Sequence, residues 1–257
     1  MKLLTALGLT AALLFVGCSA PVSSSGLPSA STDGVPDVTK APIDCTARGA
    51  GVNLSGCLLL RVNLSGADLR GADLTNVNLS DADLTNTDLR GVNLSGANLG
   101  LANLTDANLF SADLTKAKLD YANLTKAKLD YANLTGASLL GANLTEATLL
   151  EVNLSDANLM SANLFRVNLL SANLSGADLR GAILSASSLG SANLTNADLR
   201  GADLSSGSLC SANGCVEFDG AWLTYAKLRG VKWRGANLSG VEGANEVLLS
   251  CRRIADC

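Results

Sequence analysis

Leucine occurs at every fifth position of this chain from Leu54 to Leu209, which gives 32 leucines without an exception. A small residue, usually alanine, stands two positions before each leucine, and Asn or Asp stands between them in 24 of the 32 units. A period of five would scatter the leucines around an α-helix and alternate them between the faces of a strand. The pattern instead predicts short extended pieces joined by corners, repeated as a solenoid with leucine inside.

The residue after each leucine indicates how many units form one coil. Starting at residue 55, it is Ser or Thr in 15 of 16 alternate units, whereas in the other 16 units it is Ser only once, at Ser80. The true repeat is therefore ten residues. If each coil contains an even number of pentapeptides, residues of the same kind lie above one another in successive coils. Three units per coil are disfavoured and two are too tight to enclose side chains, which leaves four units, or 20 residues.

These units resemble the pentapeptide-repeat family, A(D/N)LXX, over residues 52–209. The resemblance implies an all-β fold, a right-handed quadrilateral β-helix with four pentapeptides per coil. After Leu209 the next position in register is Phe218, nine residues on, so four residues are inserted. We expect a solenoid over 45–209, a loop with a register break over 210–217, final repeats over 218–240 and a C-terminal cap over 241–257.

The N-terminal residues predict export. Lys2 and the apolar run from Leu3 to Val16 fit a signal peptide over 1–17, and the run is too short to span a membrane as a helix. Phe15-Val16-Gly17-Cys18 resembles a bacterial lipobox, although that pattern prefers Leu where Phe15 stands; an ordinary cleaved signal peptide is the alternative. The resemblance implies that Cys18 is acylated and that the protein is lipid-anchored in the cell envelope. The Ser- and Pro-rich composition that follows predicts a flexible tether over 18–44. Ser19 would indicate the outer membrane in a Gram-negative source.

Six cysteines follow Cys18, and an even number in an exported chain favours disulfides. They lie at the two ends of the repeat and at the register break, where a solenoid would fray. We expect local pairs, Cys45–Cys57, Cys210–Cys215 and Cys251–Cys257, among the 15 possible pairings. A zinc site would need four thiolates, because the chain has no histidine and no CxxC pair, so no metal is expected.

The least regular exposed positions form the candidate contact surface. Residues 20 apart stack, so the corner after each leucine gives two variable columns. Leu150 and Leu170 in one column predict an apolar docking strip, unless neighbouring side chains partly cover that corner. The residues expected to contact a partner are Phe110, Leu150, Leu170, Leu140, Met160, Arg180 and Arg200.

Two other regular features have plainer interpretations. One outward column is Asn or Asp from Asn53 to Asn193, and we favour a ladder of side chains bonded between coils over a glycan- or mineral-binding face. Residues 115–124 recur verbatim at 125–134, which is typical of a duplication. This places Lys126 between Asp106 and Glu146, a surface ion ladder that contributes little to stability.

No known catalytic pattern is present. The chain has no His, no GxxxxGK[S/T] loop and no GxSxG elbow, so neither an enzyme nor a cofactor is expected. Some members of the family mimic DNA and bind type II topoisomerases, but residues 50–209 carry only 15 acids against 10 bases. We expect a non-enzymatic envelope lipoprotein whose rigid rod acts as a spacer or binds a protein or cell-wall polymer, without nucleic acid. The sequence specifies no oligomeric state.

Overall fold

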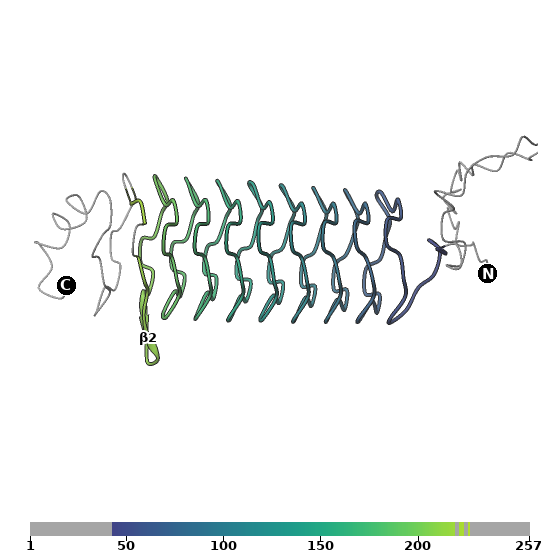
Figure 1. Cartoon of the computed structure of the whole chain (residues 1–257), viewed down its shortest axis with the longest axis horizontal. Coiled ribbons are helices and arrows are strands. Elements are labelled where there is room, and N and C mark those ends of the chain that lie inside the picture. Colours follow the sequence, from purple (N-terminus) through teal and green to yellow (C-terminus); the bar gives the residue numbers. More distant parts are fainter. Residues whose placement is uncertain (1–42, 219–220, 224–225, 227–257) are drawn as a thin grey trace, which may run out of the picture. The chain divides into compact units, whose positions relative to one another are not determined.

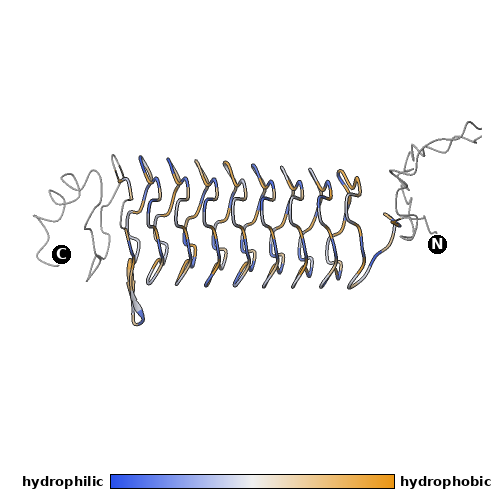
Figure 2. Ribbon diagram, in the orientation of Figure 1, coloured by the Kyte–Doolittle hydropathy of each residue, from blue (hydrophilic) through white to orange (hydrophobic). Residues whose placement is uncertain are grey.

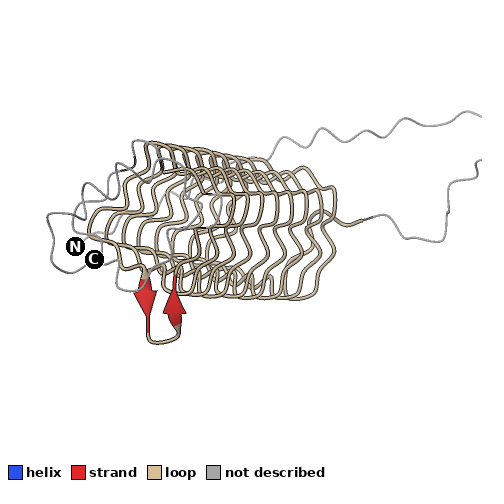
Figure 3. Ribbon diagram, turned by 60° about the vertical axis from the view of Figure 1, so that its left-hand side comes forward, coloured by secondary structure: helices blue, strands red, loops and turns tan. Residues whose placement is uncertain are grey.

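The structure, a computed structural model, describes residues 43–218, 221–223 and 226. The leader, Cys18 and nearly all of the tether lie outside the described residues, as do most of the final repeats, the expected cap, Cys251 and Cys257. Within the described range the chain winds into a stack of four-sided coils (Figures 1 and 3). The described part of the chain contains no helix that is long and apolar enough to cross a membrane.

The coil contains 20 residues. Parallel bridges join Asn53 to Asp73, Leu58 to Asn78, Asn63 to Asp83 and Asp68 to Asp88, and the same 20-residue offset continues as far as Ser188 and Ser208. Each wall contributes one bridged residue per coil, so the walls are ladders of isolated parallel bridges rather than long strands. The prediction of four pentapeptides per coil, which came from Ser or Thr following every second leucine, is therefore confirmed.

Backbone hydrogen bonds hold successive coils together. The N–H of Leu74 donates to the carbonyl of Asn93 at 2.7 Å, and the N–H of Asp73 donates back to Val52 at 2.9 Å. A third bond runs from the N–H of Gly71 to the carbonyl of Arg90 at 2.9 Å. These three bonds recur along the rod and satisfy backbone groups that would otherwise be buried without partners.

Each corner is a tight turn with a left-handed residue. The N–H of Ala72 donates to the carbonyl of Leu69 at 3.1 Å and closes one such turn. The second residue after each leucine from Leu54 to Leu204 has a positive φ, which glycine adopts without strain, as at Gly71 with φ 61°. Many corners carry larger residues in the same conformation, including Tyr131 with φ 62°. The stacked coils therefore impose the turn even where the residue disfavours it.

The interior is filled by the leucines and by the small residues two positions before them. The leucines from Leu69 onward are almost completely buried, and alanine or valine fills the remaining space. Two buried hydroxyls, on Thr87 and Ser187, donate to the carbonyls of Leu64 at 3.0 Å and Leu164 at 2.6 Å. The core is thus a narrow apolar column along the axis of the rod.

At the register break, the loop expected over 210–217 contains a short β-hairpin. β1 (Cys210–Ser211) pairs antiparallel with β2 (Gly214–Cys215), and the hairpin projects from the side of the rod (Figures 1 and 3). Beyond it the bridges join Asn193 to Glu217 and Asp198 to Trp222, an offset of 24 residues. The four additional residues therefore form the hairpin, and the coil resumes afterwards.

Candidate interaction surfaces

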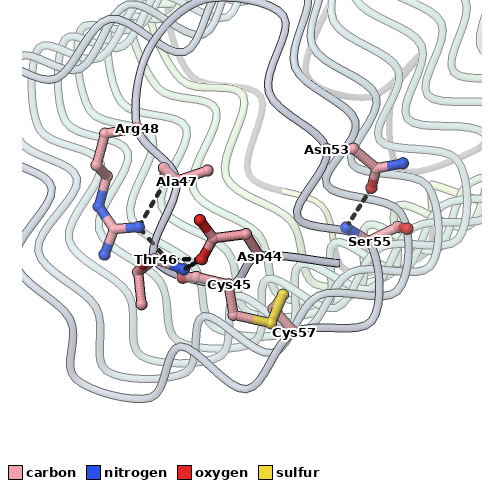
Figure 4. The surroundings of a disulfide bond; sticks show 8 residues. All are labelled: Asp44, Cys45, Thr46, Ala47, Arg48, Asn53, Ser55 and Cys57. Atoms are coloured by element: carbon pink, nitrogen blue, oxygen red, sulfur yellow. Dashed lines mark hydrogen bonds between the residues drawn. A yellow bond between two sulfur atoms is a disulfide. The ribbon is translucent and has the colours of Figure 1, made fainter. Parts of the chain in front are cut away.

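Two disulfides lie at irregular places of the rod. Cys45 is bonded to Cys57 at the first coil, with an S–S distance of 2.02 Å (Figure 4). Cys210 is bonded to Cys215 across the hairpin at 2.01 Å. Next to the first, the carboxylate of Asp44 accepts hydrogen bonds from the Thr46 hydroxyl at 2.6 Å and N–H at 2.8 Å. These bonds lower the pKa of Asp44.

The outward Asn and Asp side chains mainly bond their own turn rather than the next coil, which corrects our expectation of an inter-coil ladder. The Asn133 amide oxygen accepts from the Thr135 N–H at 3.1 Å and the Thr135 hydroxyl at 2.7 Å. In each such corner the backbone N–H of the residue two positions later donates to the Asn or Asp side chain, and this arrangement is an Asx-turn. Bonds between coils do occur, as from Asn133 Nδ2 to Thr115 at 2.9 Å. Since these oxygens already accept two bonds, the polar face is poorly suited to an external ligand.

The wall position of Ser138 departs from this rule and is served from the preceding coil. Ser138 stands where most units have Asn or Asp, and the carboxylate of Asp120 accepts its hydroxyl and, at 3.1 Å, the N–H of Leu140. Asp120 thus replaces the missing Asx-turn from one coil away.

Arginine–aspartate pairs occupy two corners of the rod. Arg70 contacts Asp68 through Nε at 2.8 Å and Nη2 at 2.6 Å, and Arg90 contacts Asp88 in the same way. The hydrogen bonds from Arg70 lower the pKa of Asp68 from 3.8 to about 2. These carboxylates are therefore neutralised by an arginine two residues away.

Arg180 and Arg200, two expected contact residues, form the second such cluster. Each binds the aspartate two residues before it, Asp178 or Asp198, with Nη2 to carboxylate distances of 2.6 Å. The guanidinium of Arg200 also lies 4.8 Å from the ring centroid of Trp222. Both arginines are exposed, but their donors already face carboxylates, so they are less available to a partner than the sequence indicated.

An apolar strip runs along one corner over four successive coils. Phe110 and Tyr131 form a T-shaped pair with ring centroids 5.3 Å apart, and their exposed fractions are 43% and 46%. The N–H of Tyr131 donates to the carbonyl of Leu150 at 2.9 Å, so the two residues lie on adjoining coils. Leu150 and Leu170 are half-buried. We call Phe110, Tyr131, Leu150 and Leu170 the Phe110 ridge.

The diagonally opposite corner carries a second strip. Tyr121 is 60% exposed, and its ring covers Gly141, where an added Cβ would lie 2.7 Å from the ring. The N–H of Gly141 donates to the carbonyl of Met160 at 3.0 Å. Leu101 is exposed, whereas Leu140 and Met160 are half-buried. We call Leu101, Tyr121, Leu140 and Met160 the Met160 ridge.

The comparisons with known proteins identify the family. The model of the family described as "Pentapeptide repeats" matches eight copies within residues 50–169 and 172–209, well over half of the chain. The chain belongs to the pentapeptide-repeat family. No curated protein matches the chain in sequence.

Two solved pentapeptide-repeat structures resemble this rod. HetL from the cyanobacterium Nostoc sp. strain PCC 7120, described as involved in regulation of heterocyst differentiation, is 36% identical, with 75% of this chain and 89% of HetL covered and a TM-score of 0.55. A trypsin-treated variant of QnrB1, described as a plasmid-mediated fluoroquinolone resistance protein, is 23% identical, with coverages of 80% and 97% and a TM-score of 0.59. The right-handed quadrilateral β-helix is therefore confirmed.

The sequence indicated part of each ridge of this pentapeptide-repeat protein and missed the rest. Phe110, Leu150 and Leu170 lie together, as do Leu140 and Met160, but the three most exposed members, Leu101, Tyr121 and Tyr131, were not expected to take part. The two tyrosines were ascribed to duplication. The missing signal was their position, second after a leucine, where the left-handed corner directs the side chain outward and along the rod. In the described part of the chain, no group of three or more His, Cys, Asp or Glu side chains could hold a metal ion.

Proposed function

We propose that this protein is an exported, lipid-anchored and non-enzymatic scaffold that binds a protein partner along the Phe110 ridge. The exposed Phe110–Tyr131 pair, which continues into Leu150 and Leu170, is the observation that carries this proposal. Outside this ridge and the Met160 ridge, the outward wall positions of the rod are mostly polar side chains already bonded to their own turns. A contiguous apolar patch on such a surface marks a contact site, and aromatic residues are enriched in protein interfaces.

The size of the ridge favours a transient contact. With an aromatic side chain contributing about 150–250 Å² in full, the exposed fractions of Phe110 and Tyr131 give about 130–220 Å², to which the half-buried Leu150 and Leu170 add a smaller area. A stable complex usually buries roughly 800 Å² on each partner. The ridge would therefore be the centre of a weak or moderate interface, with polar neighbours at its rim.

The hairpin extends this surface. Cys210 occupies the same corner column as Leu150 and Leu170, two coils beyond Leu170. Gly190 lies between them, and a Cβ on Gly190 would lie 2.4 Å from that of Ser211, so the hairpin packs directly on the corner. A disulfide-closed projection beside an apolar strip gives the partner a fixed edge against which to align.

Two features support export. Both disulfides of the described residues are of a type that persists in oxidising compartments. The N-terminal leader would direct export, and the lipobox-like Phe15-Val16-Gly17-Cys18 would provide the acylation site for an anchor. A tethered, rigid rod would hold its contact surface at a set distance from the membrane.

A cytoplasmic topoisomerase-binding protein that mimics DNA is the second candidate, and it is the less favoured. The likeness to QnrB1, at 23% identity, supports the fold alone. Mimicry needs a surface of unpaired negative charge, whereas Asp68, Asp88, Asp178 and Asp198 each bind an arginine.

Site-specific photo-crosslinking in cells tests the scaffold. A photoreactive amino acid at Tyr131 is compared with one at Asp156, which also has a positive φ and an exposed side chain but lies on a different corner. We expect one defined protein adduct at Tyr131, the same adduct from Phe110, and none at Asp156. Equal labelling at Tyr131 and Asp156, or none at either, would contradict the proposed site.

A further inference from the structure

The first coil exposes two leucines, one on a wall and one at the following corner. Leu58 stands at the outward wall position, where no other unit of the 32 has leucine, and it is 75% exposed. Leu60, at the following corner, is 53% exposed. Figure 2 shows apolar segments in every coil of the rod, including the first. Neither side chain contributes to the core, so the fold itself does not explain them.

The disulfide adds a third apolar residue to this end. Ile43 is exposed and lies two residues before Cys45, while Leu58 directly follows Cys57. The Cys45–Cys57 bond holds the two Cα atoms 5.7 Å apart (Figure 4) and so keeps the entering chain beside the first coil. We call Ile43, Leu58 and Leu60 the N-terminal patch.

The charged residues around the patch are balanced. Arg61 follows Leu60, its side chain is 82% exposed, and its Nε lies 3.6 Å from the carboxylate of Asp81. Arg48 donates to the carbonyl of Ala47 at 2.7 Å, and Asp44 lies close by in sequence. An occupant of the patch is therefore recognised mainly by apolar contact, with arginines at the edge able to reach phosphate groups.

The course of the chain indicates what covers the patch. The described chain starts at Ile43, and Cys18 precedes it by 25 residues. A random coil of that length would have a root-mean-square span of roughly 27 Å, and no chain of that length can exceed about 90 Å. If Cys18 carries the acyl anchor, the end of the rod that bears the patch is the end joined to the membrane.

We infer that the N-terminal patch is a membrane contact: Leu58 and Leu60 enter the boundary between headgroups and acyl chains, and the rod stands on its first coil. This inference rests on the proposed lipid anchor. Two leucines bind a bilayer weakly by themselves, but the tether keeps them at high local concentration beside it. With a rise of about 4.8 Å per coil, the Phe110 ridge would begin roughly 12 Å above Leu60.

Tryptophan quenching in vesicles tests the contact. Full-length acylated protein, with Trp222→Phe and Trp233→Phe to remove the native fluorophores, receives a single reporter as Leu58→Trp. Lys118→Trp is the matched control, because Lys118 is exposed on the same wall column three coils away. In vesicles of phosphatidylcholine and phosphatidylglycerol, brominated acyl chains should quench the Leu58→Trp emission about two-fold and leave Lys118→Trp unchanged, since interfacial residues lie 5–10 Å deep.

The outcomes separate this inference from the anchor on which it rests. Protein that lacks the acyl group by mass spectrometry and fails to float with vesicles overturns both. Acylated, floating protein whose Leu58→Trp emission is not quenched overturns the membrane contact alone. A Leu58→Trp emission already blue-shifted without vesicles also overturns it, because a second copy or the chain's own N-terminal segment then covers the patch.

Discussion

The carboxylate of Asp130 accepts the backbone N–H of Leu150 at 2.8 Å, although the two residues lie one full coil apart. Its second oxygen accepts the Thr148 hydroxyl at 2.8 Å. Elsewhere the same kind of N–H is bonded within its own coil, as from Leu170 to Asn168 at 3.3 Å. Thr148 has no side-chain carbonyl oxygen that could accept the Leu150 N–H as Asn168 does for Leu170. Asp130 supplies the acceptor instead and links two successive coils.

Replacing this carboxylate should destabilise the rod in a way that one further substitution repairs. We expect Asp130→Ala to lower the free energy of unfolding by about 1–2 kcal/mol, because it leaves a partly buried N–H without an acceptor. Adding Thr148→Asn should recover most of the loss by restoring the in-coil bond. Lys128→Ala, on the same wall, is the control and should stay within about 0.5 kcal/mol of the wild type. Urea unfolding followed by circular dichroism measures all four proteins, and a double variant no more stable than Asp130→Ala would refute the assignment.

The leucine column should be highly sensitive to truncation. Leu124 is fully buried in the middle of the rod, so Leu124→Ala should cost about 2–5 kcal/mol through lost transfer energy and a cavity. Leu58→Ala removes the same atoms from a side chain that is already exposed and should cost almost nothing. Thermal unfolding of the two variants side by side gives the comparison, and similar losses would mean that the interior is misassigned.

The corner glycines provide a matched pair. Gly201 and Gly141 both have positive φ, 69° and 62°, so alanine at either position should cost about 1 kcal/mol in backbone strain. Around Gly201 there is open space, whereas a Cβ at Gly141 meets the Tyr121 ring at 2.7 Å. Gly141→Ala should therefore cost more than Gly201→Ala, and Tyr121→Ala in the same chain should remove the excess. An excess that persists without the ring would contradict this packing.

The arginine-bound aspartates predict how stability depends on pH. Hydrogen bonds from Arg180 and Arg200 lower the pKa values of Asp178 and Asp198 from the usual 3.8. A carboxyl whose pKa is lower in the folded state contributes stability above its unfolded pKa and loses it as pH falls through the folded value. The difference in urea midpoint between the wild type and Asp178→Asn/Asp198→Asn should thus be full at pH 7 and shrink below about pH 4.

A control gives that pH experiment its specificity. Asp156 is exposed and makes no salt bridge among the described residues, so Asp156→Asn should change the midpoint little at any pH. If Asp178→Asn/Asp198→Asn behaves like Asp156→Asn at neutral pH, the contacts of Arg180 and Arg200 do not contribute to stability, and these are only surface pairs.

The sequence alone predicts the repetitive part of this structure because each unit repeats the same physical requirement. Leucine at every fifth residue defines the interior, and the Ser or Thr that follows every second leucine indicates the 20-residue coil. The Asp130–Leu150 bond was not predicted, because its partners become neighbours only after coils stack. The pairing of β1 with β2 was not predicted either, since six residues around a turn specify an insertion but not its conformation. The exposure of Tyr121 and Tyr131 depends on a left-handed corner that the residue types themselves disfavour.

Labelled-palmitate incorporation with cell fractionation tests the central claim most directly, by comparing the wild type with Cys18→Ala. An exported, anchored scaffold predicts label in the membrane fraction of the wild type, and neither label nor membrane retention in the variant. An unlabelled wild-type protein in the cytoplasmic fraction would contradict the anchor, export and the membrane contact of Leu58 together. It would make a cytoplasmic topoisomerase-binding role the leading account.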